Sequence, residues 1–387
     1  MIKDAVALKH LMDLLSVEGI TGQEKRVANV VKDKLARAGV KKAWMRHDQA
    51  HRDISPDFEV GNRIVKLPGT VRAPRRLFCG HLDTVPLCRG AKPVRRGARI
   101  ESAGKTARGG DNRTAVACIV SVIEAVLKNR LPHPPITALF PIAEEIGLQG
   151  SRRVDVADLG HPKTGFNIDS GIPARFIVGA IGGERWEAFV EGISSHAGMH
   201  PEHGVSAALI ASRAIADASR KGYFGKIVKG KKRGTSNVGV LRGGEATNQV
   251  TDDVYVKGEC RSHDLRFLRE ITSAWRRAFR DAAKSVRNHK RRCGRVRFEV
   301  QRDYNPFLMK EGAPILEFAN EVARSLGMKP ENIVVNGGLD ANYLNSKGIP
   351  TITLGAGQHG AHTVGEYIVV EEYLAGCRLA LGMATSC

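Results

Sequence analysis

The sequence lacks the features that mark several classes of protein. No two cysteines have C-x-x-C spacing and their number is odd, so neither a disulfide framework nor a cysteine zinc site is predicted. Aromatic residues make up only 5% of the chain, which leaves few side chains for stacking on nucleic-acid bases. The most apolar stretch, 115–127, is shorter than the ~20 residues that cross a bilayer, so no membrane span is expected. The seven cysteines are Cys79, Cys88, Cys118, Cys260, Cys293, Cys377 and Cys387.

The first twenty residues also lack the apolar centre of a secretory signal peptide. Charged residues such as Lys3, Asp4 and Asp13 are mixed with apolar ones, a pattern typical of an amphipathic helix. Together with cysteines that show no pairing pattern, this predicts a reducing compartment and a cytoplasmic location.

What the chain has in excess is positive charge. Its 387 residues include 60 Lys and Arg against 40 Asp and Glu, a net charge of +20. The range 182–303 alone holds 25 against 14, a net of +11, with basic clusters at Lys226–Arg233 and Arg287–Arg297. Such clusters could contact phosphates. However, no aromatic residues are interleaved with them and no nucleic-acid-binding module is recognisable, so we interpret them as a solvated loop and a helix end.

The length suggests two domains, at about 100–200 residues each. Outside 182–303, short apolar runs alternate with helical patterns such as Thr114–Lys128, which predicts an α/β domain with a mixed, largely parallel sheet flanked by helices. Thr21-Gly-Gln-Glu24 is interpreted as a capping box that begins a helix. The apolar runs are Arg76–Gly80, Ile136–Ala143, Thr164–Ile168 and Ile349–Leu354.

The range 182–303 has a different pattern. Strands and helices are predicted there in the order β-α-β-β-α-β, which is typical of a ferredoxin-like α+β domain. Its first helix is expected to run from Pro201 to Arg220, since proline suits a first helical turn. We therefore expect a discontinuous catalytic domain, 1–181 and 304–387, interrupted by an inserted lid domain, 182–303.

Polar side chains follow the predicted strands of the catalytic domain where each one ends. They are His81 and Asp83, Glu144 and Glu145, Asp169, and His362, while Asp111 opens a helix after two glycines. Ligands bind beyond the carboxyl ends of strands in such sheets. Two imidazoles and several carboxylates suit zinc or a similar divalent metal. A single one of these residues would most simply be a solvated loop residue, but chance is a poor account of the whole set.

The motifs that contain these residues resemble those of a known family. They are His81-Leu-Asp-Thr-Val-Pro86, Gly109-Gly-Asp-Asn-Arg-Thr-Ala115, Glu144-Glu-Ile-Gly-Leu-Gln-Gly150, Asn167-Ile-Asp-Ser170 and His362-Thr-Val-Gly-Glu366. In this order they resemble the co-catalytic dizinc metallopeptidases that include peptidase T, glutamate carboxypeptidase, aminoacylase and succinyl-diaminopimelate desuccinylase. The segments Ser195–Gly204 and Gly337–Asn342 favour peptidase T-like members.

The resemblance implies a role for each residue of the set. His81 and Asp169 would hold one metal, Glu145 and His362 the other, and Asp111 would bridge them. The two divalent ions would be zinc by default, with manganese or cobalt as alternatives.

For catalysis, the resemblance implies that Asp83 orients His81 and that Glu144 is the general base acting on a metal-bridging water. His359 competes with His362 as a ligand, but the residues after His362 match the family better. Arg89, Arg108 and Arg113 are expected to make the entrance to the site basic.

The lid domain would supply three further residues. His196 would stabilise the oxyanion, and the nearby His200 and His203 could be confused with it. Asn248 and Arg261 would bind a substrate carboxylate or backbone, although a solvated arginine is an equally simple interpretation of Arg261. The resemblance also implies a homodimer formed through the lid.

The sequence therefore predicts a dizinc exopeptidase for short peptides, an aminopeptidase of the tripeptidase type. A carboxypeptidase or a deacylase of N-acyl amino acids with the same chemistry is the alternative. A more distant alternative is a protein on a peptidase scaffold that binds RNA or another polyanion through the basic lid, although nucleic acid is not the expected partner.

Overall fold

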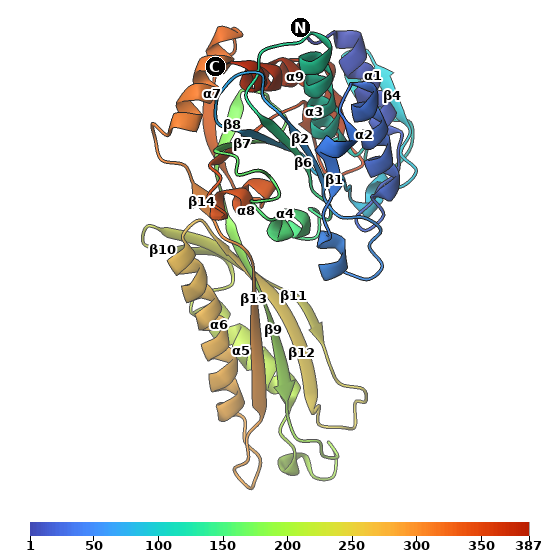
Figure 1. The fold of residues 1–387 in the computed structure, drawn as a ribbon. Helices are drawn as coiled ribbons and strands as arrows, with labels where there is room; N and C mark the ends of the chain where they lie inside the picture. Colours follow the sequence, from blue (N-terminus) through green and yellow to red (C-terminus); the bar gives the residue numbers. More distant parts are fainter. Residues whose placement is uncertain (387) are drawn as a thin grey trace. The chain divides into compact units, whose positions relative to one another are not determined.

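The computed structural model describes residues 1–386 and divides the chain into two compact units (Figure 1). Unit 1 consists of Met1–Ala180 and the chain from Leu308 onward, and unit 2 of Ile181–Phe307. The sequence-based boundaries of the inserted domain were 182 and 303. Each unit has its own hydrophobic core, so each is described by itself.

Unit 1 is built on a large sheet in which, among the described residues, nine strands pair. The path is β1 (Met45–His47), β2 (Arg63–Leu67), β6 (Ile136–Phe140), β3 (Arg76–Cys79), β7 (Thr164–Ile168), β16 (Thr351–Leu354), β8 (Arg175–Ala180) and β14 (Phe307–Leu308), with β15 (Glu331–Val335) beside β8. The four central strands β6, β3, β7 and β16 are mutually parallel. The expected mixed, largely parallel sheet is confirmed.

Helices cover both faces of this sheet because side chains alternate along each strand. In β3, Phe78 points into the main core, while Leu77 and Cys79 point into a smaller cluster on the other face. The main core is closed by α1 (Asp4–Leu15), α2 (Lys25–Arg37), α3 (Gly110–Lys128), α7 (Pro314–Ser325) and α9 (Val370–Thr385). The short helices α4 (Gln149–Arg153) and α8 (Asp340–Ser346) lie on the opposite face (Figure 1).

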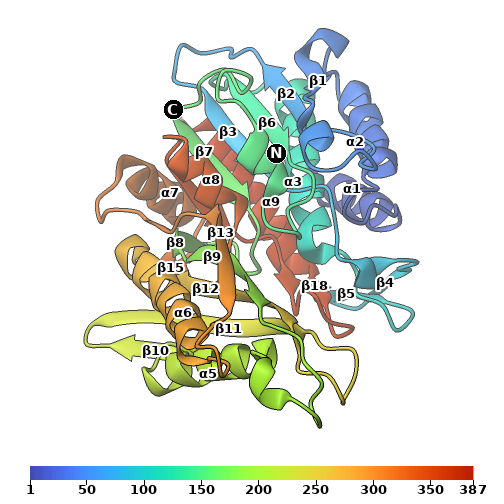
Figure 2. The same ribbon diagram turned by 90° about the horizontal axis from the view of Figure 1, so that it is seen from below.

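A small antiparallel sheet joins two distant parts of unit 1. Its order is β17 (Gln358–His359), β18 (Tyr367–Val369), β5 (Arg99–Ser102) and β4 (Pro93–Arg96). The pairing of Ile368 with Ile100 places the segment after β16 beside the segment that precedes α3 (Figure 2). This sheet therefore brings the loop of His362 to the loop of Asp111.

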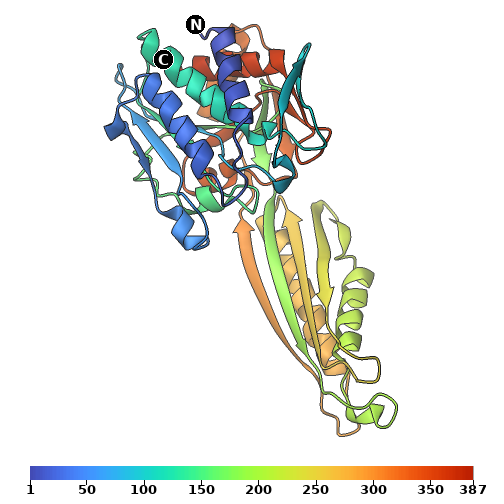
Figure 3. The same ribbon diagram turned by 90° about the vertical axis from the view of Figure 1, so that its right-hand side faces the viewer.

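Unit 2 is a five-stranded antiparallel sheet with two helices packed on one face (Figure 3). The strand order is β10 (Gly225–Lys229), β11 (Lys232–Arg242), β12 (Asp253–Ser262), β9 (Gly182–Glu191) and β13 (Arg295–Tyr304), and the helices are α5 (Ala207–Arg220) and α6 (Leu265–Ser285). Trp186 of β9 stacks on Trp275 of α6 with ring centroids 4.8 Å apart. Both rings are fully buried at the centre of this core.

Two local expectations for unit 2 were wrong. The helix does not begin at Pro201: Pro201–His203 forms one 3-10 turn, and Val205 then pairs with Ile193 as an extended residue. The helix begins at Ala207, where the Ser206 hydroxyl accepts the Leu209 amide as an N-cap.

The basic cluster Lys226–Arg233 is also not a loop. It forms most of the hairpin β10–β11, which adds a strand to the ferredoxin-like pattern. Arg287–Arg297 is divided between the turn after α6 and the start of β13.

Two further observations bear on the environment of the chain. Within residues 1–386, none of the helices combines the length and the apolar character needed to cross a membrane. The six cysteines in this range are free thiols, and Cys293 is the exposed one.

Gly258 gives a stability test of the unit 2 core. A Cβ at Gly258 would lie 2.2 Å from Cζ2 of Trp186. The indole of Trp186 is fully buried and stacked on Trp275, so it has no room to move away. We expect Gly258→Ala to lower the free energy of unfolding of unit 2 by about 1–3 kcal/mol, measured by chemical denaturation. Gly239→Ala on the neighbouring strand is the control, because its Cβ would meet nothing closer than 3.9 Å. Equal stability of the two variants would contradict this account of the core.

Candidate metal centre

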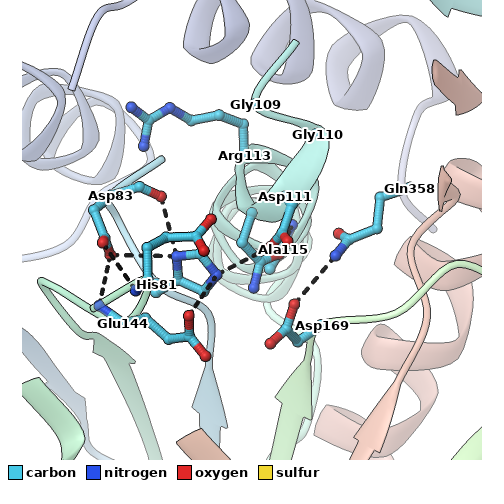
Figure 4. Close-up of polar contacts among 12 residues, drawn as sticks. His81, Asp83, Gly109, Gly110, Asp111, Arg113, Ala115, Glu144, Asp169 and Gln358 are labelled. Carbon is cyan, nitrogen blue, oxygen red and sulfur yellow. Dashed lines mark hydrogen bonds and ion pairs between the residues drawn. The ribbon is translucent and has the colours of Figure 1, made fainter. Parts of the chain in front are cut away.

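Four segments of unit 1 bring the polar side chains together beyond the carboxyl ends of parallel strands (Figure 4). His81 and Asp83 follow β3, Glu144 follows β6, and Asp169 follows β7. Asp111 lies in the first turn of α3, next to them. Parallel strands end at the same edge of a sheet, so the fold brings these residues close together.

His81 has a fixed orientation. Its Nδ1 donates to the backbone carbonyl of Asp83 (3.0 Å) and lies 3.3 Å from Oδ1 of the same residue. Its Nε2 therefore faces the centre, 3.1 Å from Oδ1 of Asp111. With Nδ1 donating to Asp83, Nε2 would be the nitrogen that offers its lone pair to a metal ion, which is the arrangement of a metal-ligating histidine.

Asp83 contacts three parts of the site and is fully buried. Besides the imidazole of His81, its carboxylate accepts the backbone amides of Glu144 (3.0 Å) and Glu145 (3.2 Å). It also accepts the hydroxyl of Thr21 (2.8 Å). Burial opposes ionisation, but these hydrogen bonds lower the pKa of Asp83, so the carboxylate is charged and holds the loop after β6 in place.

Asp111 connects two groups of potential ligands. Its Oδ1 faces His81, and its Oδ2 lies 3.3 Å from Nε2 of His362. The ligand atoms of His81, Asp111 and Asp169 lie within 4.8 Å of one another. The same holds for Asp111, Glu145 and His362. Asp111 is thus the one member common to both groups.

The second group has an unpaired oxygen. Nε2 of His362 lies 2.8 Å from Oε2 of Glu145, whereas Oε1 of Glu145 is buried without a hydrogen-bond partner. The two carboxylates of Asp111 and Glu145 raise the pKa of His362 to about 10. His359 pairs with Glu372 on α9 and belongs to neither group.

Glu144 lies beside both groups and is a member of neither. Its Oε2 is 4.0 Å from Nε2 of His81. Burial raises the pKa of Glu144 well above its usual value, and although His81 opposes this, Asp169 and Asp340 add to it.

Sequence reasoning gave no role to two residues that position the ligands. The carboxylate of Glu366 accepts the backbone amides of Arg108, Gly109 (3.0 Å) and Asp111 (3.0 Å), and so fixes the turn that presents Asp111. The amide of Gln358 donates to Oδ1 of Asp169 (3.1 Å; Figure 4). Glu366 ends the motif that begins at His362, which was its signal, whereas a lone glutamine in a glycine-rich loop gave none.

The capping box was a wrong interpretation of residues that belong to this site. The helix α2 has Glu24 at its N-cap and no side-chain cap. Thr21 bonds Asp83 instead, and Glu24, which is fully buried, accepts the backbone amide of Ala143 (3.1 Å). Both side chains therefore support the ends of β3 and β6 rather than the helix.

The expected basic entrance is also corrected. Arg113 is 1% exposed and donates to the carbonyls of Leu82 and Gly19, and Arg108 is 8% exposed and donates to the carbonyl of Val364. Both are structural groups within the fold. Arg89 is exposed and lies 3.5 Å from Glu18.

The donor set fits a pair of divalent cations. Burial and neighbouring carboxylates raise the pKa values of Asp169 and Glu145 as well as that of Glu144. So many carboxylates in one dry site repel one another unless cations lie between them. Imidazole nitrogens and carboxylate oxygens are ligands that zinc, manganese and cobalt accept.

His196, in unit 2, has a defined tautomer. Its Nδ1 accepts the backbone amides of Gly198 (3.2 Å) and Met199 (3.1 Å). Nδ1 is therefore unprotonated, and in the neutral ring Nε2 carries the hydrogen. The imidazole presents a hydrogen-bond donor on its outer side.

The other two expected substrate-binding residues also belong to unit 2. The backbone carbonyl of Asn248 accepts the amide of Ala197 (2.9 Å) and so supports the His196 loop. The guanidinium of Arg261 donates two 3.0 Å hydrogen bonds, from Nε and Nη2, to the carboxylate of Glu259, so this edge of the group is already paired.

Comparisons with known proteins show which family the chain resembles. Residues 77–386 match the model of the peptidase family M20/M25/M40. The uncharacterized protein YqjE of Bacillus subtilis is 29% identical over 99% of this chain and 98% of its own length. The crystal structure of the aminopeptidase PepT from Bacillus cereus is 30% identical with a TM-score of 0.86, covering 99% of this chain and 98% of that one. A tripeptidase structure from Staphylococcus aureus is 27% identical with a TM-score of 0.88, covering 100% and 98%.

Glu366 gives a test of how the Asp111 turn is held. We expect Glu366→Ala to lower the affinity for Zn²⁺ by about 10–100-fold, because three backbone amides lose their acceptor and Asp111 is no longer positioned. Competition with a chromophoric chelator measures this. Glu372→Ala, which removes an acidic partner of the non-ligating His359, is the control. An unchanged affinity in Glu366→Ala would contradict the positioning role.

Proposed function

Because this chain belongs to the peptidase family M20/M25/M40, we propose that it is a dinuclear metal-dependent aminopeptidase that cleaves short peptides, of the tripeptidase type. The observation that carries the proposal is the pair of ligand groups that share Asp111. The names of the two similar solved structures, an aminopeptidase PepT and a tripeptidase, support the choice of substrate.

In this proposal each group of ligands holds one divalent ion. His81 and Asp169 would hold the first ion, Glu145 and His362 would hold the second, and Asp111 would be shared by both. Zinc is the default, with manganese or cobalt as alternatives. When bound, the ions would lower the pKa of water and polarise the scissile carbonyl.

Glu144 is the proposed general base and later the general acid. Its carboxylate lies 4.0 Å from Nε2 of His81 and belongs to neither ligand group, so it remains available to take a proton. It accepts a proton from the water molecule that attacks the scissile carbonyl, and then passes this proton to the leaving amine. Asp83 positions the Glu144 backbone and the His81 ring in the same hydrogen-bond set.

Unit 2 is the proposed lid, corresponding to the inserted domain 182–303. His196, held with its Nε2–H outward, is suited to donate to the developing oxyanion. Asn248 and Arg261 are the proposed contacts to the substrate backbone or carboxylate. A substrate carboxylate would bind Arg261 by displacing or sharing Glu259. The remaining proposals are a homodimer formed through the lid and a cytoplasmic location.

The substrate is tested with a matched peptide panel. We expect the zinc-loaded protein to release the N-terminal residue from a free tripeptide such as Ala-Ala-Ala. N-acetylation should reduce kcat/KM by at least about 100-fold, because a free amino terminus is what an aminopeptidase recognises. Amidation of the carboxyl terminus serves as the second arm, with products identified by mass spectrometry.

Other outcomes of the panel favour other functions. Faster hydrolysis of the N-acetylated substrates would favour the deacylase, and release of the C-terminal residue would favour the carboxypeptidase. No hydrolysis of any member by metal-loaded protein would contradict the peptidase proposal.

The role of Glu144 is separable from metal binding. We expect Glu144→Gln to lower kcat by about 10²–10⁴-fold with the metal content unchanged, because the amide cannot accept the proton. Glu145→Gln, one residue along the same loop, should instead lose bound metal, because the second ion would lose its carboxylate ligand and His362 its ion-pair partner. Activity is measured on the tripeptide and metal by plasma mass spectrometry. Full activity in Glu144→Gln would overturn the mechanism.

A further inference from the structure

A second cluster of metal-ligating side chains lies in unit 2, on the turn that follows the His196 loop. His200, Glu202 and His203 offer ligand atoms that all lie within 4.8 Å of one another. All three side chains are exposed, so an ion could reach them from solvent. None of them has a role in the proposed peptidase chemistry.

The donor atoms have spacings that suit one ion. Oε1 of Glu202 lies 3.5 Å from Nδ1 of His200 and 3.5 Å from Nε2 of His203. Two ligands bound to zinc at about 2.0–2.1 Å in a tetrahedral arrangement are separated by roughly 3.4 Å. The imidazole rings of His200 and His203 are stacked nearly parallel, with centroids 4.9 Å apart, and both side chains are exposed. To bind one ion together, the two rings would rotate out of this stack so that both lone pairs point at it.

The backbone under this cluster is tied at several points. The amide of His203 bonds the carbonyl of His200 (3.1 Å), and the amide of His200 bonds the carbonyl of His196 (3.0 Å). The backbone amide of His289 donates to the carbonyl of Glu202 (2.9 Å), and the ring of His289 packs on that of His203 with centroids 4.4 Å apart. The turn after α6 therefore supports the cluster from a second segment.

We propose that His200, Glu202 and His203 form a separate binding site for a divalent transition-metal ion such as Zn²⁺ or Ni²⁺. Two imidazoles and one carboxylate with open positions for water are a borderline-soft donor set, which favours these ions over Ca²⁺ and Mg²⁺. The site is solvent-exposed and has three protein ligands, so it exchanges its ion faster than the buried centre of unit 1.

A bound ion would also restrain the His196 loop. The hydrogen bond from the His200 amide to the His196 carbonyl connects the ligand directly to the residue that presents Nε2–H. Occupancy would fix the part of this loop from His200 to His203, to which the carbonyl of His196 is hydrogen-bonded. The ion would thus act on the loop that carries the proposed oxyanion donor, without contacting substrate.

The experiment counts Zn²⁺ equivalents by isothermal titration on the full-length, metal-depleted protein. We expect the wild type to bind one equivalent more than His200→Ala/His203→Ala. That equivalent should remain in Asp111→Ala, where the shared ligand of the unit 1 centre is removed. His161→Asn is the matched control: His161 is an exposed histidine outside the cluster, and asparagine tolerates its left-handed backbone (φ 53°).

A second measurement reads the loop itself. Zn²⁺ added to Asp111→Ala should slow amide hydrogen exchange in peptides that cover 195–204 by at least about threefold, and should leave it unchanged when His200 and His203 are also alanine. The proposal is overturned if His200→Ala/His203→Ala binds as many equivalents as the wild type, or if Asp111→Ala binds none. Neither result depends on peptidase activity, so failure of this site and failure of the proposed function are distinguishable.

Discussion

One buried carboxylate holds the proposed centre together. Asp83 accepts four hydrogen-bond donors that come from three separate places in the chain: Thr21, the ring of His81, and the amides of Glu144 and Glu145. A charged group that is fully buried is tolerated only when its oxygens are paired in this way. The same pairing that stabilises the charge fixes three groups relative to one another: the imidazole of His81, the proposed general base Glu144 and the proposed metal ligand Glu145. The precise arrangement of the site therefore depends on one residue that belongs to neither group of potential ligands.

Both parts of the chain carry a net positive charge, but they differ in where their charged groups lie. Unit 1 buries a dense set of carboxylates around its strand ends, where the pKa values of Glu144, Glu145 and Asp169 are raised by burial and by one another. The range 182–303 carries a net charge of +11 on an antiparallel sheet whose core is built from Trp186, Trp275 and Phe279. Much of that positive charge lies on the β10–β11 hairpin and the turn after α6. The net charge is thus a property of the surface, and the chemistry of the acidic interior is independent of it.

Hydrophobic periodicity and the residue types at strand ends were enough to predict the parallel sheet and the polar residues of the centre. The parallel strands and the seven polar residues were identified because apolar runs ended at His81, Glu144 and Asp169 in a repeated pattern. Sequence reasoning failed where a side chain serves a distant partner. Thr21 and Glu24 matched a capping box locally, but their partners, Asp83 and Ala143, are far along the chain. Likewise the start of α5 depended on the pairing of Val205 with Ile193, which no local pattern reveals.

Because unit 2 is inserted into unit 1, the residues of the proposed centre are synthesised in two stages, before and after unit 2. His81, Asp111 and Asp169 all precede residue 181, so the first ligand group is complete before the inserted unit is made. His362 and the supporting Glu366 come after it, as does β16, the partner of β7. A nascent chain therefore carries four of the five proposed ligands, with Asp111 still lacking the backbone support of Glu366, while unit 2 emerges. Contacts between such distant segments form late because their loop closure is costly. The carboxylates of this site therefore stay hydrated during translation. They become buried together only when the segments after unit 2 have folded onto the sheet.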